Sequence, residues 1–177
     1  MNTIRKRLIS FLSAAVGGAT GAKIGNKMDL RANEIEKTVP HAMVERVGEG
    51  INVEFCSNIL FGSDTWALSA DAKISLDKLG AILNTFADTD IKVQGYANDK
   101  GNEALNLSLS QKYVDSVIAY LTAKGIADSR VKAEGFGETA LKYDNTTERG
   151  RSQNCRVEFL ITANQKMKAE AKKETAN

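Results

Sequence analysis

The side chains that most often catalyse reactions or bind metals are scarce in this chain of 177 residues. His41 is the single histidine, and the two cysteines, Cys56 and Cys155, form no Cys-x-x-Cys pair. A zinc site or a histidine-based triad needs several such groups together. We therefore expect no catalytic residues, no metal site and no cofactor. A formal net charge of +2 does not imply a nucleic-acid partner.

Polar residues with spaced glycines form three blocks along the chain. The first block is Gly95-Tyr-Ala-Asn-Asp-Lys-Gly101, followed by Asn106, Leu109 and Ser110. The second is Gly135-Phe-Gly-Glu138. The third is Asn145-x-Thr147-x-x-Gly150-Arg151-x-x-Asn154-x-Arg156-Val157-Glu158. A lone Gly-x-Gly would be weak, whereas three blocks in a fixed order are specific.

The elements that position these blocks can be predicted from the periodicity of the apolar residues. Alternation at Ile51, Val53 and Phe55 has the period of a half-buried strand. Three further strands are predicted at Ile91–Val93, Val131–Ala133 and Val157–Ile161. Apolar residues three and four apart predict two helices, one after Ser69 and one ending at Gly125. The order βαβαββ predicts an α/β fold of the two-layer α+β kind. Its one mixed sheet has about four strands, with both helices on one face.

On this predicted fold, the three blocks resemble the OmpA-like domain family of Gram-negative bacteria, which includes the peptidoglycan-associated lipoprotein. The resemblance covers residues 48–163. It implies a non-enzymatic domain in the periplasm, at the cell outer membrane. It also implies a groove at one edge of the sheet that binds the meso-diaminopimelate of the peptidoglycan stem peptide.

This sequence departs from the family at the two residues that contact the ligand's charges. The family has an Asp facing the ligand ammonium and an Arg facing its carboxylate, which form charge-assisted hydrogen bonds. Here these positions are Asn98 and Tyr113. Both charges are lost and no orphan charge remains, so we expect weak or altered stem-peptide binding. The neighbouring Asp99 either supplies a replacement carboxylate or is a solvated turn residue.

Other groove residues implied by the resemblance have competing structural interpretations. Asn106 and Asn154 are interpreted as hydrogen-bonding residues that hold the turns or line the groove. Arg151 and Arg156 are interpreted as lining the groove. Arg156 alternates with Val157, so a position on the solvent face beside Glu158 is equally consistent.

Residues 1–27 have a signal-like pattern, because a basic cluster precedes a run of apolar and small residues. Within it, Gly17, Gly21 and Gly25 recur every fourth residue, which places them on one face of a helix. One interpretation is the end of a cleaved signal peptide. The other is a glycine zipper, similar to the lead of some family lipoproteins, that packs helices at a membrane and makes a homo-oligomer.

The remaining segments are expected to be extensions of the domain. We predict that residues 28–47 are a linker with a short helix that stops before Pro40. Residues 164–177 are rich in Lys, Glu and Ala, and we predict a charged flexible tail.

The two cysteines form a possible disulfide. In the family's sheet the first and fourth strands are antiparallel neighbours, so Cys56 at the end of one would lie beside Cys155 at the start of the other. A periplasmic location would permit oxidation. Two independent buried thiols are the alternative.

Two functions follow from the sequence. The first is an envelope module that anchors peptidoglycan non-covalently through an altered groove and contacts outer-membrane or other envelope proteins. The second is an envelope scaffold that has lost diaminopimelate binding and acts through protein contacts.

Overall fold

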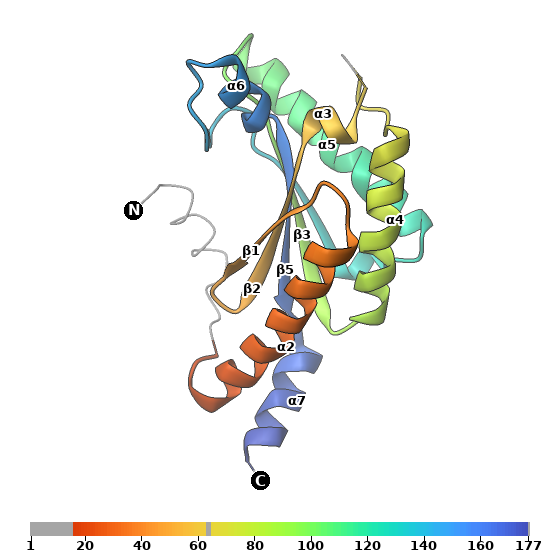
Figure 1. The fold of residues 1–177 in the computed structure, drawn as a ribbon, viewed down its shortest axis with the longest axis vertical. Helices are drawn as coiled ribbons and strands as arrows, with labels where there is room; N and C mark the ends of the chain where they lie inside the picture. Colours follow the sequence, from red (N-terminus) through yellow and green to blue (C-terminus); the bar gives the residue numbers. More distant parts are fainter. Residues whose placement is uncertain (1–15, 63–64, 177) are drawn as a thin grey trace.

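A five-stranded mixed sheet forms the centre of the computed structural model, which describes residues 16–62 and 65–176 (Figure 1). The strands are β1 (Met43–Val47), β2 (Gly50–Cys56), β3 (Thr89–Tyr96), β4 (Val131–Gly135) and β5 (Arg156–Ala163). Their order across the sheet is β1-β2-β5-β3-β4, and only the β3–β4 pair is parallel. The predicted α+β fold with a mixed sheet is confirmed. The additional strand, β1, lies in the segment that was expected to be a linker.

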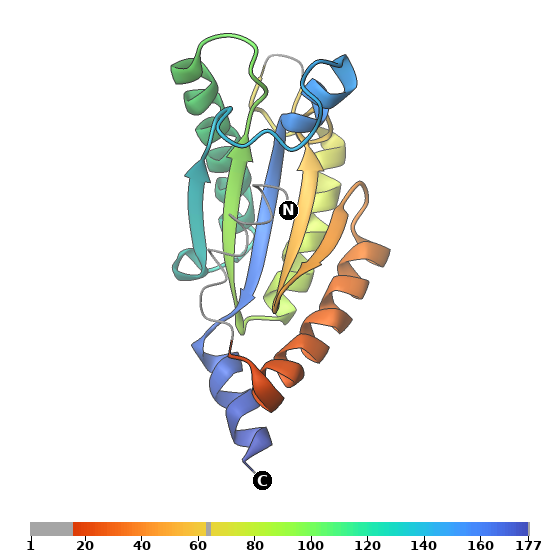
Figure 2. The same ribbon diagram turned by 90° about the vertical axis from the view of Figure 1, so that its left-hand side faces the viewer.

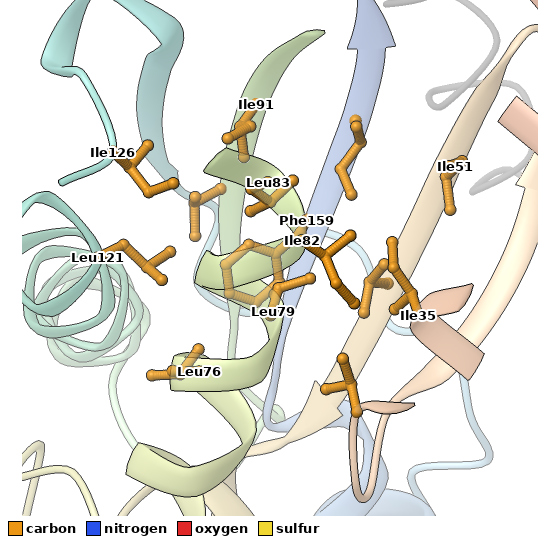
Figure 3. Close-up of a cluster of buried hydrophobic side chains, with 14 of the residues drawn as sticks. Ile35, Ile51, Leu76, Leu79, Ile82, Leu83, Ile91, Leu121, Ile126 and Phe159 are labelled. Carbon is orange, nitrogen blue, oxygen red and sulfur yellow. The ribbon is translucent and has the colours of Figure 1, made fainter. Parts of the chain in front are cut away.

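The two predicted helices cover one face of this sheet. They are α4 (Ala70–Thr85) and α5 (Glu103–Ala123). The Ser69 hydroxyl caps α4 by accepting a hydrogen bond from the Ala72 N–H at 3.0 Å, which satisfies a donor that the first helical turn leaves free. Leu76, Leu79 and Leu83 of α4 pack on Phe159 and Ile91 of the sheet (Figure 3). Each such buried side chain contributes about 1.5–3 kcal/mol.

A long helix, α2 (Gly18–Thr38), occupies much of the expected linker. Ile24, Met28 and Ile35 are buried along one side of α2 and join the main core. The helix ends just before Pro40, as predicted. The linker prediction for residues 28–47 is therefore wrong, because α2 and β1 pack against the domain.

The C-terminal segment forms a second extra helix, α7 (Gln165–Thr175), where a flexible tail was expected. The Asn164 side chain caps it, accepting from the Met167 N–H at 3.2 Å. Met167 and Ala171 are fully buried, and α7 packs beside α2 (Figure 2). The prediction of a flexible tail was wrong because the apolar face of α7 consists of only two residues, Met167 and Ala171. The helix that covers this face, α2, is distant in the sequence. We call the paired α2 and α7 the helix end.

The three spaced glycines do not share one helix face. Gly17 precedes α2 and has a φ of 65°, a backbone conformation that favours glycine. Gly21 faces the β1–β2 turn, where an added Cβ would lie 2.6 Å from a Glu49 carboxylate oxygen. Glu49 also accepts hydrogen bonds from the Val16 and Gly17 N–H groups, at 3.2 and 3.1 Å. Gly21 therefore permits the hairpin to approach α2, whereas an added Cβ on Gly25 would make only an ordinary contact with Arg46, at 3.8 Å.

Most of the expected signal-like run, residues 1–15, lies outside the described residues. Among residues 16–62 and 65–176, no helix is both long and apolar enough to cross a bilayer.

Candidate functional site

The three polar blocks meet at the end of the molecule opposite α2 and α7 (Figures 1 and 2). Loop 97–102 follows β3, and loop 136–147 connects β4 to the short helix α6 (Glu148–Asn154). A single-turn helix, α3 (Ser57–Leu60), follows β2 at the same end of the molecule. Away from this site, a 3₁₀ turn, η1 (Asp128–Arg130), precedes β4. We call loop 97–102, loop 136–147, α6 and the adjoining residues 54–56 and 155–158 the loop end.

The Asn98 side chain stabilises the conformation of loop 97–102. Its Oδ1 accepts from the Lys100 N–H at 3.0 Å, which closes an Asx turn. Its Nδ2 lies 3.5 Å from the Arg151 carbonyl, at the outer limit of a hydrogen bond. Asp99 is exposed on the same turn.

Asn106 joins both loops from the first turn of α5. Its buried amide nitrogen contacts the carbonyls of Asn98 and Lys100 at 3.2 and 3.1 Å. The same nitrogen donates to the Glu138 carboxylate at 2.6 Å. Two amide hydrogens thus hold loop 97–102 against loop 136–147.

Tyr113 places an aromatic ring at the position where the resemblance led us to expect an Arg. The ring is half-buried and stacks on buried Phe61, with centroids 4.4 Å apart and planes at 13°. On the neighbouring residue, the Lys112 ammonium lies 4.1 Å from the centre of the Trp66 ring. Trp66 is 46% exposed, so this side of α5 presents aromatic surface together with the Lys112 cation.

Asn154 and Arg151 fasten loop 136–147 to α6. The fully buried Asn154 accepts from the N–H groups of Lys142 and Tyr143 at 2.8 and 2.9 Å. Its Nδ2 donates to the Tyr143 carbonyl at 3.0 Å. The Arg151 guanidinium donates to the Asn145 and Thr146 carbonyls, both at 3.1 Å.

Arg156 lies neither in a ligand groove nor on the solvent face. It is fully buried on the sheet face opposite α4 and α5, and its guanidinium carbon lies 3.9 Å from the centre of the Tyr96 ring. Its Nε donates to the buried Glu158 carboxylate at 2.7 Å. Its two Nη atoms donate to the Asn154 and Ala140 carbonyls at 3.1 and 3.2 Å. Both interpretations from the sequence are corrected, because loop 136–147 folds back over this face.

Glu54 on β2 is the residue that the sequence patterning missed. Its side chain is 2% exposed and receives the Lys142 ammonium at 2.5 Å and the Tyr143 hydroxyl at 2.7 Å. Burial and the hydrogen bond to Glu54 raise the pKa of Tyr143, so its hydroxyl remains a donor. The alternation around Glu54 is typical of a solvent-facing residue, and no local signal indicates the loop that covers it.

The structure has two free thiols at the expected disulfide. Cys56 is the strand partner of Arg156 rather than of Cys155, and the Ser57 N–H donates to the Cys155 carbonyl at 2.8 Å. Burial raises the pKa of Cys56, and the nearby Glu54 carboxylate raises it further. Burial also raises the pKa of Cys155, against the lowering effect of the Asn98 backbone N–H. The alternative of independent thiols is the one observed.

The described part of the chain holds no group of three or more His, Cys, Asp or Glu side chains that could bind a metal. His41 lies exposed in the turn between α2 and β1, far along the chain from the loop end.

The comparison with protein families identifies this arrangement. The OmpA family model matches residues 60–155, which is more than half of the chain. The chain belongs to the OmpA family. The match includes Asn98, Asn106, Tyr113 and α6, whereas Glu54 and the helix end lie outside it.

Curated relatives of this OmpA-family chain include envelope proteins. It is 29% identical over 144 residues to the probable lipoprotein YiaD of Escherichia coli, covering 80% of this chain and 66% of that protein. It is 32% identical over 112 residues to the peptidoglycan-binding protein ArfA of Mycobacterium tuberculosis, covering 63% and 34%. The chain thus spans just under two thirds of the first relative and about a third of the second.

Solved structures share the fold. A putative MotB-like protein from Desulfovibrio vulgaris superposes with a TM-score of 0.68 at 22% identity, covering 90% of this chain and 96% of that one. The cell wall anchor of the type VI secretion system from Pseudomonas aeruginosa gives 0.66 at 24% identity, covering 76% and 95%. At these identities the likeness concerns the fold alone.

Proposed function

We propose that this chain is a non-enzymatic envelope protein whose OmpA domain holds peptidoglycan non-covalently at the loop end. The observation that carries the proposal is the ordered pair of loops that Asn106 and Asn154 hold together, built from the polar blocks of the family. The name of the relative ArfA, a peptidoglycan-binding protein, supports the same ligand class.

The proposed ligand is a stem peptide that is bound weakly, or one that carries less charge than usual at the diaminopimelate. Asn98 offers a neutral amide where the family has a carboxylate, and Tyr113 offers a ring stacked on Phe61 where the family has a guanidinium. Truncating one partner of a desolvated charge pair costs about 2–5 kcal/mol. The two changes are electrically matched and leave no orphan charge, which fits a site retuned for a less charged ligand.

Asp99 is a candidate for compensation within this proposal. It is exposed and adjacent to Asn98, so its carboxylate can reach a ligand ammonium from a neighbouring direction. Arg151 and Asn154 are proposed to shape the loops rather than to contact the ligand, because their polar atoms bind loop carbonyls and N–H groups.

The proposed location is the periplasmic face of the cell outer membrane. The described chain begins at the helix end, so attachment through the N-terminal segment would direct the loop end away from the membrane, toward the wall (Figure 1). Self-association through Gly17, Gly21 and Gly25 is not part of this proposal, because Gly17 precedes α2 and Gly21 faces Glu49 of the β1–β2 turn.

The second candidate function is a scaffold that has lost peptidoglycan binding. It is favoured by the loss of both ligand charges at Asn98 and Tyr113. In that case the loop end would serve protein contacts within the envelope.

Co-sedimentation with purified peptidoglycan sacculi, with and without free diaminopimelate, separates these functions. We expect weak pelleting of the wild-type chain and stronger, diaminopimelate-competable pelleting of the double variant Asn98→Asp, Tyr113→Arg. The variant Asp99→Asn tests whether the Asp99 carboxylate replaces the one that is missing at Asn98. Absence of pelleting by every variant would favour the scaffold. Tight competable binding that Asp99→Asn abolishes would overturn the altered-affinity proposal and assign the ammonium contact to Asp99.

A further inference from the structure

Glu54 occupies an unusual position for a carboxylate. It lies in the middle of the sheet, on the face away from α4 and α5, and is 2% exposed. Its direct cross-strand neighbour on β5 is Glu158, which is fully buried. Like charges directly opposite one another destabilise a sheet, and a buried carboxylate needs a partner. This pair therefore requires compensation from elsewhere in the chain.

Two different segments supply that compensation. Arg156 neutralises Glu158 at 2.7 Å from within the same strand, and its Nε also lies 4.0 Å from a Glu54 carboxylate oxygen. Lys142 neutralises Glu54 at 2.5 Å from loop 136–147, 88 residues further along the chain. The Tyr143 hydroxyl adds a hydrogen bond to Glu54 at 2.7 Å. Glu54 is thus held by two consecutive side chains of one loop.

The contacts of this loop lead to the proposed ligand turn. Just after Tyr143, the carbonyls of Asn145 and Thr146 bind the Arg151 guanidinium at 3.1 Å. The Arg151 carbonyl in turn lies 3.5 Å from the Asn98 amide nitrogen. A continuous set of contacts therefore runs from the sheet at Glu54, through the loop and α6, to the turn that contains Asn98.

We propose that Glu54 is a positioning residue for the loop end: through Lys142 and Tyr143 it fixes loop 136–147 on the sheet, and so sets the shape of the ligand-binding turn. The ligand-related part of this inference rests on the proposed function, whereas the fixing of the loop does not. Glu54 lies on β2, before residues 60–155, which the family model matches. Loop 136–147, which lies within the match, is therefore held by a strand outside it.

Hydrogen–deuterium exchange of the loop tests this role without any ligand. In Glu54→Gln, the Lys142 ammonium loses its counter-ion, and we expect backbone amides of residues 138–147 to exchange about tenfold faster or more. Amides of β3 and β5 near the helix end should keep their wild-type protection. The matched control is Glu134→Gln, because Glu134 lies in the same cross-strand row but has a 42% exposed side chain and pairs with Lys92 of β3 at 2.5 Å.

Two further variants keep the test decisive. Glu54→Gln combined with Lys142→Gln removes both charges and leaves two amides that can bond each other, so part of the loop protection should return. Tyr143→Phe removes one hydrogen bond without changing charge and should raise loop exchange by a smaller factor, even if Glu54→Gln does not fold. The proposal is overturned if loop exchange in Glu54→Gln or Tyr143→Phe matches the Glu134→Gln control. It is also overturned if exchange rises equally in every strand.

Sacculus binding gives the functional readout. Glu54→Gln should weaken pelleting of the Asn98→Asp, Tyr113→Arg background at least severalfold, while Glu134→Gln leaves it unchanged. If no variant pellets but loop exchange responds as expected, the proposed function fails and the positioning role of Glu54 stands. If the Asn98→Asp, Tyr113→Arg protein pellets equally well with and without Glu54→Gln, the connection from Glu54 to the ligand turn is refuted.

Discussion

The helix end and the loop end each join segments that are far apart in the sequence, but they do so with different chemistry. At the helix end, α2 and α7 meet through Met28, Met167 and other apolar residues, with one largely buried ion pair, Arg31–Asp88, and exposed ion pairs on the outside. At the loop end, the contacts are buried charges and amides. Apolar contacts weaken gradually as atoms are removed, whereas removing one partner from a buried ionic network leaves an uncompensated charge. The loop end should therefore be the less tolerant of substitution.

The largest effect is expected from Arg156→Ala at the loop end. It removes the counter-ion of Glu158 and the donor to the Ala140 carbonyl, so we expect a loss of about 3–5 kcal/mol in the free energy of unfolding. Urea denaturation followed by circular dichroism measures it. Arg149→Ala, at an exposed site on α6, is the control and should change stability by no more than about 0.5 kcal/mol. A loss no larger than the control's would show that the buried network contributes nothing.

A smaller effect is expected at the helix end from Met167→Ala. Met167 is fully buried between α7 and α2, and truncating a buried Met costs about 2–5 kcal/mol. We expect the lower half of that range, because α7 is short and can adjust. The same urea titration compares it with Met43→Ala, which truncates a 42% exposed Met on β1. If Met167→Ala costs more than Arg156→Ala, the proposed difference in tolerance between the two ends is wrong.

The exposed ion pairs of the helix end should respond to pH and salt. Lys27, followed by Lys23, lowers the pKa of Glu174. A carboxylate with a lowered pKa in the folded state adds stability above its unfolded pKa, and this stability is lost as the pH falls through the folded pKa. We expect Lys27→Gln to lower the urea midpoint at pH 7 by less than Met167→Ala does, and to have no effect once the pH is below the folded pKa of Glu174. One molar salt should abolish the difference at pH 7. Persistence of the difference at pH 2.5 would mean that Lys27 acts through packing.

The smallest effect is expected at the thiols of the loop end. Burial raises the pKa of both Cys56 and Cys155, so little thiolate is present at neutral pH. We expect slow labelling of the native protein by a thiol reagent, faster labelling as the pH rises, and two reactive thiols after denaturation without reductant. Denatured protein with no reactive thiol, and a two-dalton mass gain on reduction, would contradict the free-thiol structure.

The sequence predicted the regular centre of the fold because local periodicity is strong there. The alternation of β2 and the helical spacing of α4 each report a face that packs on the core. The α7 helix was missed because Met167 and Ala171 make too narrow a stripe to indicate burial without α2. Glu54 and Arg156 were missed for a related reason: a polar residue that alternates with core residues looks solvent-facing until a distant loop covers it. Asn98 and Tyr113 came from the family resemblance and not from periodicity.

The direction of the strands has a mechanical consequence for a chain held at both ends. The strands lie roughly along the long axis of the molecule and span the distance between the helix end and the loop end, with β5 antiparallel to β2 and β3 (Figure 2). Tension between a membrane attachment at one end and a wall contact at the other would act nearly parallel to them. Backbone hydrogen bonds between antiparallel strands lie perpendicular to the strand direction. Such tension would therefore shear the β2–β5 and β5–β3 pairs, stretching many bonds together, instead of unzipping them one at a time.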